Sequence, residues 1–180
     1  MTGQRSPLPD GDDRIVRAPQ LTQRDKVVLR GFRYYHYRQK IAYSQARPTQ
    51  MRLPRETTRL DCSGLVACCM DFAEVKPRVD WRYTNTWIQI RWGRHVTPST
   101  AKPGDVVFYG RPGDPSHEAL FLGTLAQLKK LVTVPGEVAS QMRGSGPYVL
   151  SMGHYPMGIY VLDYRRDRID IRDMIGRSNV

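Results

Sequence analysis

Residues 61–72 read Asp-Cys-Ser-Gly-Leu-Val-Ala-Cys-Cys-Met-Asp-Phe. The polar start and the apolar residues after it predict a helix that is capped at its N-terminus and buried on one side. Cys62 would stand at the N-terminal end of this helix, where backbone N–H groups and the helix dipole favour the thiolate. Because the thiolate is the reactive form of cysteine, Cys62 is the candidate nucleophile of the chain.

The other two cysteines, Cys68 and Cys69, fall among apolar residues of the same predicted helix. We expect them to be buried and inert, since free cysteine in such surroundings behaves as a small hydrophobe. Three cysteines within eight positions form no disulfide framework and suit a reducing compartment. Their side chains would point in divergent directions, whereas zinc needs converging ligands. No metal site and no cofactor are therefore expected.

His117 opens the run His-Glu-Ala-Leu-Phe-Leu-Gly, directly after a turn rich in Gly and Pro. On a strand, His117, Ala119 and Phe121 share one face, so the imidazole would stand at the strand's start beside a small residue. If the helix of Cys62 packs there, sulfur and imidazole can meet and form an ion pair. A surface histidine at a strand end is the alternative that spacing alone leaves open.

Helical patterns precede strand patterns along the chain. Thr22 followed by Asp25 predicts a helix start, and residues 84–92 predict a shorter helix closed by Gly93. Residues 44–60 resemble a loop. Short strands are predicted at residues 105–109, 118–122, 128–134, 148–152 and 159–163. This order predicts an α+β fold with the N-terminal helices packed on one face of an antiparallel sheet of about five to six strands.

The chain has 180 residues, which suits one domain, and 28 Lys and Arg against 17 Asp and Glu give a net charge of +11. The basic residues are scattered and match no nucleic-acid-binding signature, so we expect attraction to an anionic polymer without base reading. Residues 1–20 are polar and rich in proline, which predicts a flexible leader and no secretory signal. No apolar stretch approaches the ~18 residues that a membrane span requires.

Three motifs in this order resemble the NlpC-type cell-wall cysteine peptidases, which have a papain-like fold. They are Asp-Cys-Ser-Gly-Leu-Val at residues 61–66, Pro-Gly-Asp-Val-Val-Phe-Tyr-Gly at 103–110, and Ser116-His117 with the β-run that ends at Gly123. The resemblance covers about residues 25–165. It implies a peptidase domain at residues 21–165, preceded by the leader and followed by a C-terminal extension at 166–180.

The resemblance also implies an amidase or endopeptidase that cleaves the stem peptide of peptidoglycan, with Cys62 as nucleophile and His117 as base. Tyr43 resembles the family tyrosine that lies near the nucleophile, although a core aromatic at a helix end is an equal alternative. The residues around the nucleophile are expected to bind substrate or to help form the oxyanion hole: Asp61, Ser63 and Gly64.

The family has a third polar residue that orients the imidazole, usually on the strand after the histidine strand. His154 is the candidate here, and Ser151 is the alternative because Gly153 could mark a bulge that changes which side chain faces inward. Another departure is Glu118, where relatives usually carry an aliphatic residue. On a regular strand Glu118 points away from the face of His117, so it either leaves the catalytic pair intact or shapes a substrate pocket.

The stretch that leads into Asp163-Tyr164-Arg165 is similar to peptidase domains of endolysins from phages that infect actinobacteria. This likeness implies synthesis in the host cytoplasm, action at the bacterial cell wall, and electrostatic contact with anionic wall polymer. Two alternatives stay open. One is a papain-like acyltransferase or deamidase toxin, since fold does not fix function. The other is a basic nucleic-acid-binding module in which cysteine and histidine are incidental.

Overall fold

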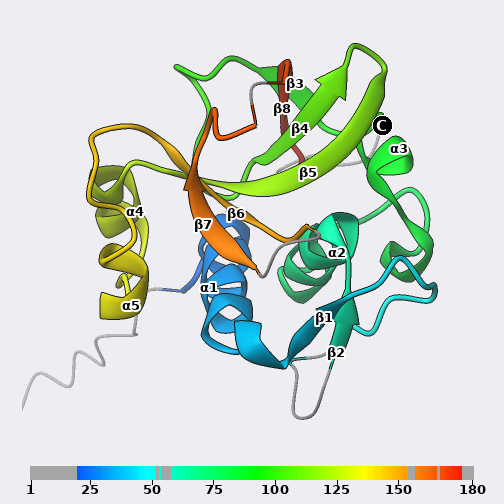
Figure 1. Ribbon diagram of the computed structural model, residues 1–180, viewed down its shortest axis with the longest axis horizontal. Helices are drawn as coiled ribbons and strands as arrows, with labels where there is room; N and C mark the ends of the chain where they lie inside the picture. The colour runs from blue at the N-terminus through cyan, green and yellow to red at the C-terminus, as the bar shows by residue number, and fades with distance from the viewer. Residues whose placement is uncertain (1–19, 52, 54–57, 154–156, 166, 176–180) are drawn as a thin grey trace, which may run out of the picture.

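The computed structural model describes residues 20–51, 53, 58–153, 157–165 and 167–175. Its main element is a six-stranded antiparallel sheet with the strand order β3-β8-β4-β5-β6-β7. Figure 1 shows helices α1 and α2 together against the sheet, with α4 and α5 to one side. The predicted α+β architecture, with N-terminal helices on one face of the sheet, is confirmed.

The helices are α1 (Gln23–His36), α2 (Cys62–Phe72), α3 (Thr86–Gln89), α4 (Leu125–Leu131) and α5 (Gly136–Ala139), and short 3-10 helices span Arg38–Lys40 and Trp81–Tyr83. The sheet strands are β3 (Arg94–Val96), β4 (Val106–Arg111), β5 (Asp114–Gly123), β6 (Tyr148–Ser151), β7 (Gly158–Val161) and β8 (Ile169–Asp173). A separate parallel pair joins β1 (Ile41–Tyr43) to β2 (Thr58–Leu60). Strand β2 lies at the end of the segment 44–60 that the sequence predicts as a loop, and β1 directly precedes that segment.

Helix α1 begins where the sequence predicts. The Thr22 hydroxyl accepts a hydrogen bond from the Asp25 N–H, and the Asp25 carboxylate accepts one from the Thr22 N–H. Gly31 in this helix serves close packing, because a Cβ there would lie 2.8 Å from Leu120 and 3.2 Å from Leu150. A residue that lowers helix propensity therefore lets α1 approach the sheet closely.

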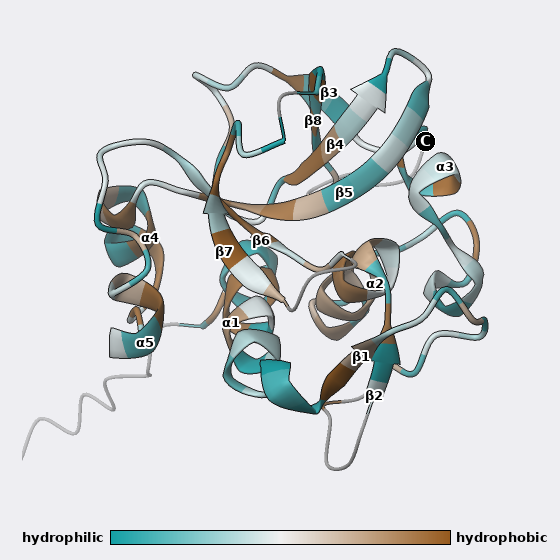
Figure 2. Ribbon diagram, viewed as in Figure 1, coloured by the Kyte–Doolittle hydropathy of each residue, from teal (hydrophilic) through white to brown (hydrophobic). Residues whose placement is uncertain are grey.

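Strand β5 separates two hydrophobic clusters, as its alternating side chains require. Leu120 and Leu122 belong to the larger cluster, together with α1 and α2, whereas Ala119 and Phe121 belong to a smaller cluster on the other face. Figure 2 shows that β5 is hydrophilic near its start and hydrophobic toward its end. The polar start of this strand is where the candidate site lies.

The segment predicted as a strand at residues 128–134 is helical instead in its first part. Helix α4 begins with a capping box. The Thr124 hydroxyl accepts a hydrogen bond from the Gln127 N–H, and the Gln127 side chain accepts one from the Thr124 N–H. The strand prediction is wrong because Leu125, Leu128 and Leu131 recur at helical spacing directly after this N-terminal capping box.

The segment 166–180, predicted as an extension, contributes a strand to the sheet. Strand β8 lies between β3 and β4 and pairs with both. Neither β3 nor β8 was predicted, since both are short and carry charged residues. The fold therefore continues past residue 165. The predicted leader lies outside the described residues except for Gln20, and so does His154.

Candidate active site

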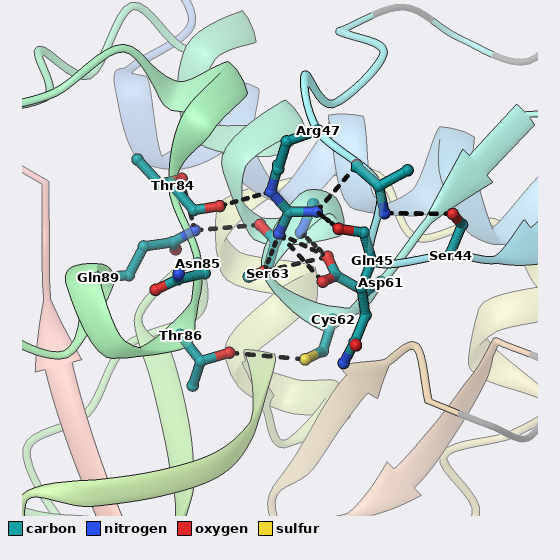
Figure 3. A network of polar contacts seen from close by, with 12 residues as sticks. Ser44, Gln45, Arg47, Asp61, Cys62, Ser63, Thr84, Asn85, Thr86 and Gln89 are labelled. Carbon is teal, nitrogen blue, oxygen red and sulfur yellow. Dashed lines mark hydrogen bonds and ion pairs between the residues drawn. The ribbon is translucent and has the colours of Figure 1, made fainter.

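The predicted N-cap of α2 is present. Oδ1 of Asp61 accepts hydrogen bonds from the Gly64 N–H at 2.7 Å and from the Ser63 hydroxyl at 3.0 Å. Arg47 completes this arrangement: its Nη2 donates to Oδ2 of Asp61 at 3.0 Å and to Oγ of Ser63 at 2.7 Å (Figure 3). Asp61 is only 5% exposed. Three donors surround its buried carboxylate: the cation Arg47, the Ser63 hydroxyl and the Gly64 N–H.

Arg47 also ties the start of α2 to the segment that leads into α3. Its Nε donates to the carbonyl oxygen of Thr84 at 2.8 Å, and Gln89 donates both to the Ser63 carbonyl at 3.1 Å and to the Thr84 hydroxyl at 3.0 Å (Figure 3). Neither Arg47 nor Gln89 was singled out from the sequence. Arg47 lies in an Arg- and Pro-containing loop, where nothing in the sequence distinguishes it from its neighbours.

These contacts bear on the groups predicted to meet substrate. The Gly64 N–H is already bonded to Asp61, and the Ser63 hydroxyl lies between Asp61 and Arg47 with Ser63 only 1% exposed. In the structure these groups make hydrogen bonds that stabilise the N-terminus of α2 inside the protein. Their role toward substrate stays a prediction.

Cys62 is the first residue of α2, as predicted, and is 7% exposed. Its sulfur lies 3.7 Å from the Thr86 hydroxyl (Figure 3). A backbone hydrogen bond from Glu118 in β5 favours the ionised form of the thiol and lowers its pKa. Burial raises the pKa of the Cys62 thiol, and the nearby charges of Glu118 and Asp61 raise it further. Burial therefore opposes the preference for the thiolate that the N-terminus of α2 was expected to give.

Tyr43 ends β1 and lies in the electrostatic surroundings of the thiol. Burial raises the pKa of Tyr43, and the charge of Cys62 is the next cause of that shift. Its hydroxyl accepts a hydrogen bond from Nε2 of Gln45 at 3.1 Å. The structure thus brings the predicted tyrosine toward the nucleophile, and it does so from a strand instead of a helix end.

His117 is 5% exposed, so the alternative of a surface histidine is excluded. Its Nε2 lies 2.7 Å from the Ser151 hydroxyl on β6, and that hydroxyl lies 2.8 Å from the hydroxyl of Tyr164. Ser151 is thus the described residue of the two candidates that contacts the imidazole. Tyr164, which the sequence analysis did not weigh as a site residue, extends the contact into a chain of three polar groups.

The thiol comes from the start of α2 and the imidazole from β5, and these two elements pack against each other. The backbone of Glu118, which directly follows His117, is near enough to the Cys62 sulfur to affect its pKa. The remaining cysteines, Cys68 and Cys69, are buried and unbridged, and burial raises the pKa of the Cys68 thiol to about 11. Cys62 is the cysteine that meets the polar start of β5.

Within the described ranges, no group of three or more His, Cys, Asp or Glu residues is placed to hold a metal ion. No helix in the part of the chain described is both long enough and apolar enough to cross a membrane.

Comparison with known proteins agrees with this geometry. The model of the NlpC/P60 family matches residues 34–149, which include the thiol, the imidazole and most of the sheet. The chain belongs to the NlpC/P60 family. The resemblance predicted from three motifs is thereby confirmed.

Among curated relatives, the chain is 37% identical over 101 residues to the peptidoglycan endopeptidase RipB of Mycobacterium tuberculosis. It is 35% identical over 101 residues to the peptidoglycan endopeptidase RipA of Mycolicibacterium smegmatis. The aligned stretch spans 55% of this chain, but only 39% of RipB and 19% of RipA. The chain therefore spans less than half the length of these relatives.

Solved structures show the same fold at low sequence identity. RipD of M. tuberculosis, described as a non-catalytic NlpC/p60 domain protein adapted to peptidoglycan binding, superposes with a TM-score of 0.53 at 19% identity. That match covers 86% of this chain and 98% of the RipD chain. The P60 domain of an antigen from M. avium paratuberculosis also has a TM-score of 0.53 at 19% identity, covering 83% of this chain and 91% of that one.

Proposed function

We propose that this chain is a cysteine peptidase that hydrolyses an amide bond in the stem peptide of peptidoglycan. The observation that carries the proposal is that α2 places the Cys62 sulfur against the β5 backbone beside His117, while Ser151 holds the imidazole from β6. The relatives RipA and RipB, named as peptidoglycan endopeptidases, support the substrate class.

His117 acts as general base through Nδ1, because Ser151 holds Nε2. The thiol is protonated in the free protein, so its proton passes to Nδ1 as the sulfur attacks the peptide carbonyl carbon. A C–S bond forms, and the oxyanion is stabilised by backbone N–H groups at the start of α2. His117 then gives the proton to the departing amine as the C–N bond breaks. Water, deprotonated by His117, attacks the thioester and releases the carboxylic acid and the thiol.

Ser151 orients the imidazole by a contact that serves both of its protonation states. Its hydroxyl accepts from Nε2–H both in the neutral tautomer whose unprotonated Nδ1 acts as the base and in the charged ring. The Tyr164 hydroxyl fixes the position of Ser151 from the other side. A neutral orienting group adds no charge to stabilise imidazolium, which agrees with a thiol that gives up its proton only during attack.

The test is digestion of purified peptidoglycan, with the released fragments identified by mass. Cys62→Ala and His117→Ala should each abolish release of peptide fragments while circular dichroism and the melting temperature stay near those of the wild-type protein. Cys68→Ala is the matched control, since it removes a thiol from the same helix and should leave cleavage intact. Full activity of Cys62→Ala or of His117→Ala would refute the assignment.

A second candidate function is binding to peptidoglycan without cleavage, which the similarity to the non-catalytic RipD favours. The presence of Cys62 next to the backbone of the His117 strand favours hydrolysis instead. Sedimentation with insoluble peptidoglycan separates the two functions. Binding by the wild-type protein with no fragment released would support the second candidate and exclude the first.

We also propose that the net charge of +11 holds the enzyme on anionic wall polymer. Attraction of this kind weakens as salt shortens the screening length from ~10 Å at 0.1 M to ~3 Å at 1 M. Binding to whole cell walls should therefore fall steeply between these salt concentrations. Adsorption that does not change with salt would contradict the electrostatic mechanism.

For the setting, we propose a phage endolysin that is made in the host cytoplasm and acts at the cell wall. Support comes from the likeness of the strands near Leu150 and Tyr160, which lead into Asp163-Tyr164-Arg165, to endolysin peptidase domains. Expression inside an actinobacterial host should cause lysis only when a holin is expressed with it. Lysis without a holin would contradict this setting.

A further inference from the structure

A second carboxyl group lies beside the nucleophile. Glu118 follows His117 on β5, and its side chain lies on the helix-facing side of the sheet, the side of Leu120 and Leu122. The residue is 0% exposed. Neither of its carboxyl oxygens has a hydrogen-bond partner or an ion pair within the part of the chain that the structure describes. Burial of an ionised carboxylate without partners is strongly unfavourable.

The groups around Glu118 offer it little compensation. Cys62 and Asp61 approach it from the start of α2, and each would add a negative charge next to its own. Arg47 is the cation whose charge reaches it, but this guanidinium is bonded to Asp61 and Ser63. From the neighbouring strand β4, the residue directly opposite Glu118 is the apolar Phe108.

We propose that Glu118 is held as the neutral acid and is a positioning residue that restrains the nucleophile, because this pocket admits one negative charge, on the thiolate or on Glu118. The thiolate then forms readily only while Glu118 keeps its proton. This restraint concerns the reactivity of Cys62 and holds whatever the substrate is.

The direction of the ionisation shifts agrees with the proposal. Burial raises the pKa of Glu118 well above the ordinary value, with the charge of Asp61 as the next cause. After burial, the charge of Glu118 is the largest cause that raises the pKa of Cys62. In the pH range where Glu118 ionises, removal of the carboxyl group should therefore lower the pKa of the thiol, and each unit of that shift multiplies the thiolate fraction there by about ten.

The experiment is alkylation of the folded protein by iodoacetamide between pH 6 and pH 10, with the modified cysteine identified by peptide mass mapping. Glu118→Gln keeps the shape and removes the charge, and Glu118→Val restores an aliphatic side chain. Asp114→Asn is the control, since it neutralises an exposed carboxylate on the same strand. Both Glu118 variants should match wild type near pH 6, where Glu118 keeps its proton, and should alkylate Cys62 at least about ten-fold faster than wild type near pH 10, where an ionised Glu118 opposes the thiolate. Asp114→Asn should match wild type throughout.

Coincident pH profiles for wild type and Glu118→Gln would overturn the proposal, as would slower alkylation of the variant. Labelling of Cys68 and Cys69 reports loss of the fold, so only Cys62-selective labelling is scored.

A second measurement does not depend on the variants' reactivity. Infrared spectra at neutral pH should show a protonated carboxyl band that is absent from both Glu118 variants. No such difference band would also overturn the proposal. Peptidoglycan cleavage is not the readout, so failure of the proposed function is distinguished from failure of this inference.

Discussion

Two buried acids, Asp61 and Glu118, lie near the thiol of Cys62, and they differ in their hydrogen-bond partners. Asp61 has the guanidinium of Arg47, the Ser63 hydroxyl and the Gly64 N–H around its oxygens, whereas both oxygens of Glu118 lack partners among the described residues. Asp61 is 5% exposed and Glu118 is 0% exposed, so burial alone does not separate them. The difference teaches that partners decide whether a buried carboxyl serves as a structural anion or as a neutral acid.

The largest effect on stability is expected from removing the carboxylate of Asp61, the buried acid that has hydrogen-bond partners. Asp61→Ala removes the cap of α2 and leaves Arg47 and Ser63 without their acceptor. It should lower the free energy of unfolding by about 3 kcal/mol, the lower end of the range for breaking a buried pair, because Arg47 retains the Thr84 carbonyl. Urea denaturation measures the change. Asp114→Ala, at an exposed site, should cost less than ~0.5 kcal/mol. Equal losses in the two variants would contradict the structural role of Asp61.

Glu118, the buried acid without hydrogen-bond partners among the described residues, should make the stability of the protein depend on pH. Because the pKa of Glu118 is raised in the folded state, the folded protein binds its proton more tightly than the unfolded chain. The stabilisation from this group is full below the unfolded pKa of ~4.3 and is lost as pH rises toward the folded pKa, by at most about 1.4 kcal/mol for each pH unit.

Glu118→Gln should therefore gain stability relative to wild type as pH rises from 5 to 8. Paired urea titrations at each pH measure this difference, and Asp114→Asn is again the control. A difference that stays constant across this interval would show that Glu118 is ionised in the folded protein.

Ser151 extends the comparison to a buried polar group that touches the imidazole directly. Ser151→Ala leaves Nε2 of His117 without this contact, and we expect kcat/KM for peptidoglycan fragments to fall by about ten-fold or more, the loss of one net hydrogen bond. The pH–rate profile should also change if Ser151 acts through the imidazole, since a purely structural role would leave it unmoved. An unchanged profile and rate would remove Ser151 from the site and leave His154 as the candidate.

The smallest effect on kcat/KM is expected at Tyr164, which contacts Ser151 and lies one residue further from the imidazole. Tyr164→Phe removes the hydroxyl that lies 2.8 Å from Ser151 but keeps the ring that packs on Tyr160 and Tyr109. A decrease of a few-fold in kcat/KM is expected, smaller than that of Ser151→Ala, with the melting temperature close to wild type. An effect larger than that of Ser151→Ala would show that Tyr164 acts on substrate and not through Ser151.

The sequence was sufficient for the parts of the site that depend on local signals. The cap at Asp61, the helix after it and the strand after His117 follow from residue types at fixed spacing, and each has the expected secondary structure. The partners of these residues could not be predicted, because Arg47 and Thr86 reach the site from loops and short turns whose course depends on tertiary packing. The same holds for β8, whose pairing with β4 joins residues about 65 positions apart.

The ionisation state of the thiol was the point at which local reasoning failed. A helix N-terminus favours the thiolate, whereas burial of Cys62 next to two acids raises the pKa of its thiol. Burial of Cys62 depends on how α2 packs against β5, which the local pattern of residues 61–72 does not contain.

Covalent trapping can show whether Cys62 attacks the substrate with His117 as its base. A stem-peptide analogue that carries an electrophile in place of the cleaved bond should add one label to the wild-type protein, and peptide mapping should place it on Cys62. His117→Ala should label much more slowly at the same position, whereas Cys68→Ala should label as wild type does. A label on any residue other than Cys62, or labelling at full rate in His117→Ala, would contradict the account.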